Sequence, residues 1–124
     1  MNRAVSFFEI PAVDFDRAVK FYEDLFGVKL EQMDCGREKM AFFPAEDGLS
    51  PGAISWSSAF DFGPSAQGVL VSLNCKSITD SEKTIERGGG KILIPKTKIE
   101  SDSRGYFCVF LDSEGNRVGL YCDK

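Results

Sequence analysis

The chain has 124 residues, of which 43% are hydrophobic and 27% are charged, and its formal net charge is -4 at pH 7. This length predicts a single domain with one shared core. The acidic balance, with Lys and Arg scattered along the chain, gives no basic surface for a phosphate backbone, so we expect no nucleic-acid partner. Apolar runs fall far short of the roughly 18 to 20 residues that cross a bilayer, and no signal-peptide pattern opens the chain. We therefore expect a cytoplasmic protein with no membrane partner.

The chain contains four cysteines and no histidine. The cysteines lack CxxC spacing, and we interpret them as reduced thiols that act mostly as small buried hydrophobic residues. The lack of histidine removes the commonest general base and the commonest transition-metal ligand. Any chemistry would therefore depend on carboxylates, thiols, hydroxyls or backbone groups.

The first half of the chain predicts a strand, a helix and three further strands. An apolar strand over residues 5–10 precedes a helix over residues 15–26, in which apolar side chains recur at helical spacing. Asp14 is the expected N-cap and Gly27 the expected C-terminal stop. The three strands that follow cover residues 28–33, 39–43 and 53–57.

The second half repeats this order. A strand over residues 69–75 precedes a helix over residues 78–87, which begins with the capping pattern of Ser77 and Asp80 and stops at Gly88. Three strands are expected after it, over residues 91–94, 106–111 and 118–122. The duplication predicts an α+β fold built from two βαβββ modules, over about 1–60 and about 66–124, within a single domain.

Three segments of the chain carry a family resemblance: FFEIPAVDFDRAVKFYEDLFGVKL at 7–30, GGKILIPKTKI at 89–99 and YFCVFLDSEGNRVGLY at 106–121. They resemble the vicinal oxygen chelate (VOC) superfamily of glyoxalases, bleomycin-resistance proteins and extradiol dioxygenases. The pair Phe21-Tyr22 with Gly27, together with the turn over 112–117, carries the likeness. It implies two βαβββ modules in a curled mixed sheet around a cleft, and a homodimer.

Many members of this superfamily hold a divalent metal in the cleft, with ligands from the first and last strand of each module. Counting back from the helix starts, the resemblance puts the two first-strand ligand positions at Phe7 and Leu70. The matching positions on the last strands are about Ser55 and Gly119. The two apolar side chains cannot bind a metal, serine is a poor ligand, and glycine has no side chain. Because the chain departs from the family pattern at all four positions, we expect a protein with no metal and no other cofactor.

Glu9 is the most notable ionisable residue of the expected cleft. Strand periodicity places it on the same face as Phe7, with apolar neighbours. It could act as a catalytic base or anchor a ligand. Alternatively, it accepts structural hydrogen bonds or pairs with Arg3 or Arg117.

Other residues of the expected cleft combine polar groups with apolar walls, a mixture common in sites for small organic ligands. The predicted ligand-binding residues are Phe7, Ser55, Trp56, Leu70, Ser72, Phe110 and Tyr121. In the alternative interpretation, aromatic side chains fill this space as part of the core.

Three functions remain open at this point. The first is the binding of a small, partly apolar molecule without a metal, as the resemblance to bleomycin-resistance proteins implies. The second is a lyase or isomerase related to lactoylglutathione lyase, with Glu9 as its base. The third is an interaction domain with a filled cleft. The fold alone does not choose among them.

Overall fold

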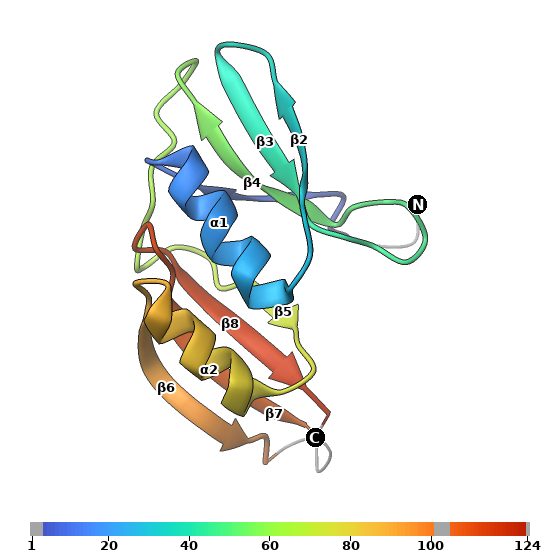
Figure 1. Cartoon of the computed structure of the whole chain (residues 1–124), viewed down its shortest axis with the longest axis vertical. Coiled ribbons are helices and arrows are strands. Elements are labelled where there is room, and N and C mark those ends of the chain that lie inside the picture. Colours follow the sequence, from blue (N-terminus) through green and yellow to red (C-terminus); the bar gives the residue numbers. More distant parts are fainter. Residues whose placement is uncertain (1–3, 101–104, 124) are drawn as a thin grey trace.

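The computed structural model describes residues 4–100 and 105–123, and these form two similar units of one helix and four strands (Figure 1). The first unit consists of β1 (Phe8–Pro11), α1 (Phe15–Phe26), β2 (Glu31–Asp34), β3 (Glu38–Phe42) and β4 (Gly52–Ser57). The second consists of β5 (Ser72–Asn74), α2 (Ile78–Arg87), β6 (Lys91–Lys98), β7 (Tyr106–Leu111) and β8 (Arg117–Cys122). The expected order of strand, helix and three strands is confirmed in both halves.

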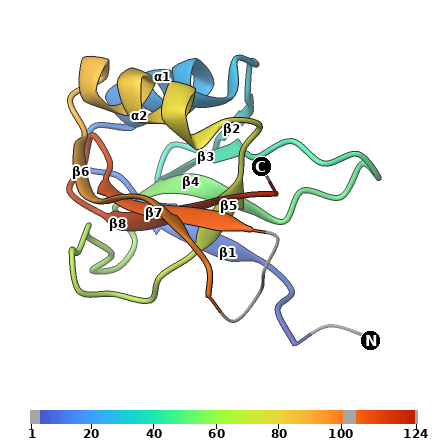
Figure 2. The ribbon, with the colours of Figure 1, turned by 90° about the horizontal axis from the view of Figure 1, so that it is seen from below.

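Each unit forms its own mixed sheet, with strand order β1-β4-β3-β2 in the first and β5-β8-β7-β6 in the second. In both sheets the strand before the helix pairs in parallel with the last strand, and the other pairs are antiparallel. The two helices lie side by side on one side of the sheets, as Figure 2 shows. No helix of the described residues lies on the opposite side, which we call the helix-free face.

The helix boundaries follow from their capping residues. The Asp14 carboxylate accepts a hydrogen bond from the Arg17 backbone N–H at 3.1 Å, and the Ser77 hydroxyl accepts one from the Asp80 N–H at 3.2 Å. Both satisfy an N–H group that has no partner within the helix. Helix α1 ends at Gly27, whose φ of 69° lies in the left-handed region that glycine adopts without strain. These predicted caps and the Gly27 stop are confirmed.

The two sheets share one core beneath the helices. Tyr22 of α1 is fully buried, and its ring meets that of Phe43 at a centroid distance of 5.5 Å. The neighbouring Phe21 reaches into the second unit and packs against Phe110 of β7 at 6.1 Å. The core is therefore continuous across the two units, as the length of the chain required.

Two strands differ from the sequence expectation. Strand β6 continues to Lys98, through Pro95, with register shifts against β7 on either side of Ile94. Proline is tolerated there because β6 is an edge strand, so its missing N–H leaves no gap in the ladder. Strand β5 is shorter than expected, and Val69, in the segment before it, is 89% exposed.

None of the four cysteines, all of which lie within the described residues, forms a disulfide bond. Cys108 and Cys122 are buried, Cys75 is half-buried and Cys35 is exposed. Burial raises the pKa of the Cys108 thiol to about 12, so this side chain is not a nucleophile at neutral pH. Within the part of the chain that the structure describes, no helix has both the length and the apolar character needed to cross a membrane.

Candidate functional site: the cavity between the two units

A cavity of about 260 Å³ lies where the first unit meets the second. Its walls come from β1, the start of β8, the linker between the units and the segment before β5. The lining residues are Phe8, Glu9, Ile10, Pro11, Gly63, Ser65, Gly68, Val69, Val71, Asn116, Arg117 and Val118.

Hydrogen bonds from the start of β8 hold the walls of this cavity together. The Asn116 side chain donates to the Pro11 carbonyl at 2.7 Å and accepts from the Ser65 backbone N–H at 3.1 Å. The Arg117 backbone N–H donates to the Ser65 carbonyl at 3.3 Å, and its Nη2 donates to the Gly68 carbonyl at 3.3 Å. These bonds tie β1, the linker and β8 to one another, so the cavity has a defined shape.

Two charged side chains line the cavity. Glu9 is exposed, and its carboxylate has no hydrogen bond or ion pair with any residue in the described ranges 4–100 and 105–123. The Nε of Arg117 is buried and also has no hydrogen-bond partner among the described residues. Since Ile10, Val71 and Val118 supply apolar walls, the cavity combines apolar surface with one acidic and one basic group.

The turn between β7 and β8 fixes this geometry. Asp112, only 3% exposed, accepts hydrogen bonds from the Tyr22 hydroxyl at 2.7 Å and the Asn116 amide at 3.1 Å. Its other oxygen accepts from the backbone N–H groups of Glu114 and Asn116, both at 2.9 Å. Burial, together with the charge and hydrogen bond of Asp112, raises the pKa of Tyr22 well above its ordinary value. The phenol therefore stays a donor, and the turn binds helix α1 from a distance of 90 residues along the chain.

Glu114 extends the same turn onto the start of α1. Its carboxylate accepts from the backbone N–H groups of Val13 and Asp14 at 2.9 and 2.8 Å, and from Arg17 Nε at 2.7 Å. Burial acts to raise the pKa of Glu114, but the hydrogen bonds from Arg17, Asp14, Ser113 and Val13 outweigh it and lower the pKa. The sequence predicted this segment only as a hairpin turn. Its carboxylates gave no signal of partners about 100 residues away.

The sheet registers correct one of the positions assigned to metal ligands. In the second sheet Gly119 pairs with Ser72, which lies five residues before the helix cap. The matching residue of the first unit is Glu9, and its partner on β4 is Ala53. Ser55 lies two residues further along and pairs with Pro11. Ala53 therefore takes the place that sequence counting gave to Ser55.

The residues at these positions do not fit the metal that the superfamily resemblance implies. Each lacks a side-chain donor atom: Phe7, Ala53, Leu70 and Gly119. Moreover, the Ser72 hydroxyl lies 2.6 Å from the point where a Cβ at residue 119 would stand, so a ligating side chain there would require Ser72 to move. Among the described residues, no group of three or more His, Cys, Asp or Glu side chains could hold a metal ion.

Most of the predicted site residues lie on the helix-free face. Their neighbours in the strands, such as Ile10 and Ile54, point into the core beneath the helices, so the alternate residues point away from it. Phe7 is 38% and Leu70 45% exposed, and Ser72 is exposed as well. Ser55 is only 3% exposed, and its hydroxyl has no partner among the described residues.

Two predicted residues lie on the side of the helices, and Tyr121, which shares the helix-free face with Gly119, does not line the cavity. Phe110 is fully buried against Phe21, on the side of the helices. Trp56 also packs against the core there, with Lys39 Nζ at 5.3 Å from its ring. Tyr121 lies toward the end of β8, and its hydroxyl donates to Asp123 at 2.8 Å. Of the predicted set, Glu9 is the residue that lines the cavity itself.

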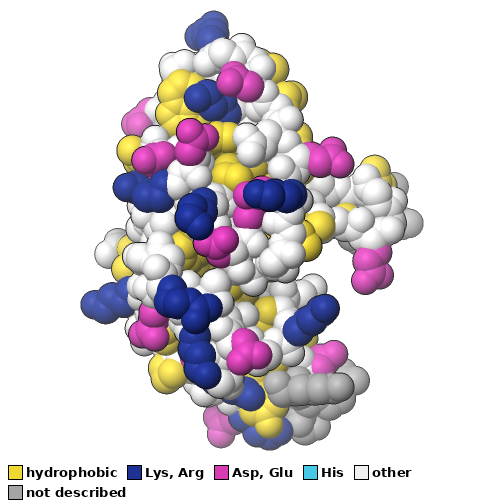
Figure 3. All heavy atoms as spheres, in the orientation of Figure 1, with side chains coloured by type: hydrophobic (Ala, Val, Ile, Leu, Met, Phe, Trp, Pro, Cys, Tyr) yellow, Lys and Arg dark blue, Asp and Glu magenta, His cyan; other side chains and the backbone are white. Residues whose placement is uncertain are grey.

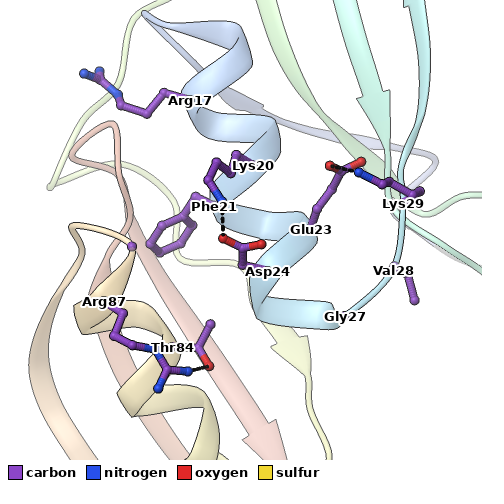
Figure 4. Close-up of a pocket in the computed structure, with 11 residues that line it drawn as sticks. Arg17, Lys20, Phe21, Glu23, Asp24, Gly27, Val28, Lys29, Thr84 and Arg87 are labelled. Atoms are coloured by element: carbon purple, nitrogen blue, oxygen red, sulfur yellow. Dashed lines mark hydrogen bonds and ion pairs between the residues drawn. The ribbon is translucent and has the colours of Figure 1, made fainter.

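A wider hollow, of about 1040 Å³, lies between α1 and α2 on the opposite side (Figure 4). Its charged groups already have partners: Lys20 binds Asp24 at 3.0 Å, and Lys29 lies 3.7 Å from Glu23. Acidic and basic side chains are interspersed over this whole helical face in Figure 3. We interpret the hollow as a solvated groove between two surface helices, and the cavity between the units as the candidate site.

Comparison with solved structures shows the same fold in proteins of low sequence identity. Glyoxalase I from Zea mays is 18% identical, with a TM-score of 0.68 over 94% of this chain and 45% of its own. A glyoxylase/bleomycin resistance protein/dioxygenase domain from Frankia sp. EAN1pec is 17% identical, with a TM-score of 0.70 over 100% of both chains. A family enzyme from Burkholderia phytofirmans PsJN is 14% identical, with a TM-score of 0.68 over 98% of this chain and 100% of its own.

The chain spans less than half the length of the maize enzyme. No curated protein matches it. The family model for the Glyoxalase/Bleomycin resistance protein/Dioxygenase superfamily, however, matches residues 4–120, which is nearly the whole chain. On this evidence the chain belongs to the glyoxalase/bleomycin resistance protein/dioxygenase superfamily.

Proposed function

We propose that the protein binds a small, partly apolar molecule in the cavity between its two units, without the metal ion of its superfamily. The observation that carries this proposal is a cavity with apolar walls and two charged groups, beside four positions that offer no metal donor. At about 260 Å³ the cavity lies just below the range of roughly 300 to 1,000 Å³ typical of ligand sites, so it suits a compact molecule.

Metal analysis tests the first part of this proposal. Protein purified without chelators should contain far less than one tightly bound divalent ion per chain, measured by inductively coupled plasma mass spectrometry. Removal of trace metal with a chelator should leave the melting temperature unchanged. A stoichiometric ion that resists dialysis would overturn the metal-free assignment.

A pair of variants tests the location of the site. Val69 lines the cavity and is 89% exposed, so Val69→Trp should obstruct the cavity at little cost in stability. Leu49 is 77% exposed in the loop between β3 and β4, away from the cavity, and Leu49→Trp is the matched control. Ligand-observed NMR with a library of small organic molecules should give hits that Val69→Trp loses and Leu49→Trp keeps. Hits that persist in Val69→Trp would place the site elsewhere.

A second copy of the chain is the partner that we propose. Large apolar side chains on the helix-free face remain exposed, among them Phe7, Met33 and Leu70 at 38%, 38% and 45%. Packing two such faces together would remove this surface from water. Light scattering should give twice the chain mass of 13.7 kDa, and a monomer at micromolar concentration would contradict the proposal.

An enzymatic role, as a lyase or isomerase, is the alternative that Glu9 supports. Its carboxylate lines the cavity and is unpaired among the described residues, so it is free to take a proton from a bound molecule. Once a substrate is found by screening, Glu9→Gln should abolish turnover while the fold, measured by circular dichroism, is kept. Unchanged turnover would remove Glu9 from the reaction.

A further inference from the structure

We propose that the ligand of the cavity is a small organic acid, and that its carboxylate binds the guanidinium group of Arg117. This inference rests on the proposed function, because it names the chemical class of the molecule that the cavity would hold.

The first observation is that no carboxylate in the described part of the chain compensates the charge of Arg117. Among the described residues its buried Nε has no hydrogen-bond partner, and its Nη2 donates to the Gly68 carbonyl at a long 3.3 Å. No carboxylate of the described residues lies within ion-pair distance of this guanidinium. A partly buried cation without a counter-ion is costly, and Arg117 lines the cavity, so an anion that entered the cavity would offset this cost.

The second observation is that Arg117 is held in place. It is the first residue of β8, where it pairs with Leu111 of β7, and its backbone N–H is bound to Ser65. The backbone is thus fixed on two sides, and a planar guanidinium can donate two parallel N–H bonds to the two oxygens of a carboxylate. Binding would therefore require little ordering of the backbone at this position.

The third observation concerns the acidic residue of the same cavity. Glu9 lines the cavity, yet it forms no ion pair with Arg117, so the two charges do not neutralise each other. Its negative charge disfavours a second carboxylate nearby and favours a hydrogen-bond donor. The arrangement suits an organic acid that also carries a hydroxyl or amino group, with the acid toward Arg117 and the donor toward Glu9.

Matched pairs of probes test this inference. Small hydroxy acids and amino acids are compared with the corresponding primary amides, at constant ionic strength, by isothermal titration calorimetry and ligand-observed NMR. The wild-type protein should bind acids at least tenfold more tightly than amides. Inorganic phosphate serves as a further probe and should bind more weakly than the acids. Equal binding of acids and amides, or binding of phosphate alone, would overturn the assignment of a carboxylate.

Variants connect the preference to the side chain. Arg117→Gln should reduce the affinity for acids at least tenfold and leave the affinity for amides nearly unchanged. Arg117→Lys keeps the charge but loses the planar guanidinium, so its ratio of acid affinity to amide affinity should lie between those of the wild type and Arg117→Gln. It also provides a folded variant if Arg117→Gln is unstable. Arg37→Gln is the control: it removes an exposed arginine from the β2–β3 turn and should leave the ratio of acid affinity to amide affinity unchanged.

The outcomes separate this inference from the proposed function. Neutral molecules that bind the wild type and are lost in Val69→Trp, with no dependence on Arg117, would overturn the inference alone. If no probe or library member binds in a manner that Val69→Trp abolishes, both the inference and the proposed site fail. An acid preference that survives in Arg117→Gln would assign recognition of the anion to another residue.

Discussion

The two units follow one plan, but the turns before their last strands differ. In the second unit the turn over residues 112–116 binds the first unit at three places: Glu114 contacts the start of α1, Asp112 accepts from Tyr22 within α1, and Asn116 donates to the Pro11 carbonyl of β1. In the first unit the equivalent loop, over residues 43–51, approaches the start of α2 through Pro44. A hollow of about 460 Å³, lined by Pro44 and by Ser77 at the helix start, remains there.

This difference shows that one turn carries much of the polar contact between the units. The same turn that binds α1 also places Asn116 and Arg117 at the cavity. The loop of the first unit carries no comparable set of bonds to α2 within the described residues, and is free to vary without moving the site. Stability and the shape of the candidate site should therefore depend on residues 112–116 far more than on residues 43–51.

Asp112→Ala should have the largest effect of any single change in this comparison. It removes a buried carboxylate that accepts four hydrogen bonds, from Tyr22, Glu114 and twice from Asn116, and leaves those donors unsatisfied. We expect a loss of about 3 kcal/mol in the free energy of unfolding, measured by urea titration at pH 7.

The matched control for Asp112→Ala is Asp47→Ala. Asp47 is exposed in the equivalent loop of the first unit, where its side chain accepts one hydrogen bond, from the Leu49 N–H at 3.1 Å. Its replacement should cost about 0.5 kcal/mol or less. Similar losses for the two variants would show that the turns are energetically equivalent, contrary to the comparison.

The sequence predicted the repeated architecture but not this asymmetry. The spacing of apolar residues, the helix caps and the glycine stops are local signals, so they were sufficient to predict the two helices and the order of the strands. Asp14, Ser77 and Gly27 are examples. The contact between Asp112 and Tyr22 joins residues 90 positions apart, and nothing in either local sequence identifies the partner. The turn was therefore recognised only as a turn.

The candidate site was predictable to a similar degree. Alternation along the first strand pointed to Glu9, which lines the cavity. The sequence indicated Arg117 only as a possible partner of Glu9, because the burial of its Nε without a partner among the described residues is a property of the folded chain. The position assigned on β4, about Ser55, lies two residues from Ala53, the partner of Glu9, since the length of the loop over residues 43–51 gives no measure of where strand pairing resumes.

Tyr22→Phe isolates a single bond of the turn. The Tyr22 hydroxyl donates to Asp112 at 2.7 Å in a fully buried position, and phenylalanine keeps the ring packing. We expect a loss of about 2 kcal/mol at pH 7. Because the pKa of Tyr22 is raised in the folded protein, its contribution is complete below about pH 10 and is lost as pH rises further. The difference in the free energy of unfolding between the wild type and Tyr22→Phe, measured by urea titration, should therefore become smaller above about pH 10. A difference that stays constant with pH would contradict the role of the Tyr22 hydroxyl as a donor to Asp112.

Glu114→Gln tests the charged part of the same contact. The pKa of Glu114 is lowered on folding, so its carboxylate contributes stability above the unfolded pKa, near 4.3, and this contribution is lost as pH falls through the folded pKa. Glutamine keeps acceptors for the N–H groups of Val13 and Asp14 but loses the charge. We expect the variant to be about 1 kcal/mol less stable at pH 7 and to approach the wild type by about pH 3. A difference that is independent of pH would exclude a role for the charge.

The helix caps give the smallest and most direct test of the asymmetry. Ser77→Ala removes the cap of α2 and should cost about 1 kcal/mol. Asp14→Ala removes the equivalent cap of α1, but Glu114 still places a negative charge at that helix end and still accepts from the Val13 and residue-14 N–H groups. Because this charge continues to complement the helix dipole, we expect a cost of only about 0.5 kcal/mol. When Glu114→Gln is already present, the loss in the free energy of unfolding caused by Asp14→Ala, measured by urea titration, should rise toward the loss caused by Ser77→Ala. If it does not rise, Glu114 does not support the start of α1 through its charge.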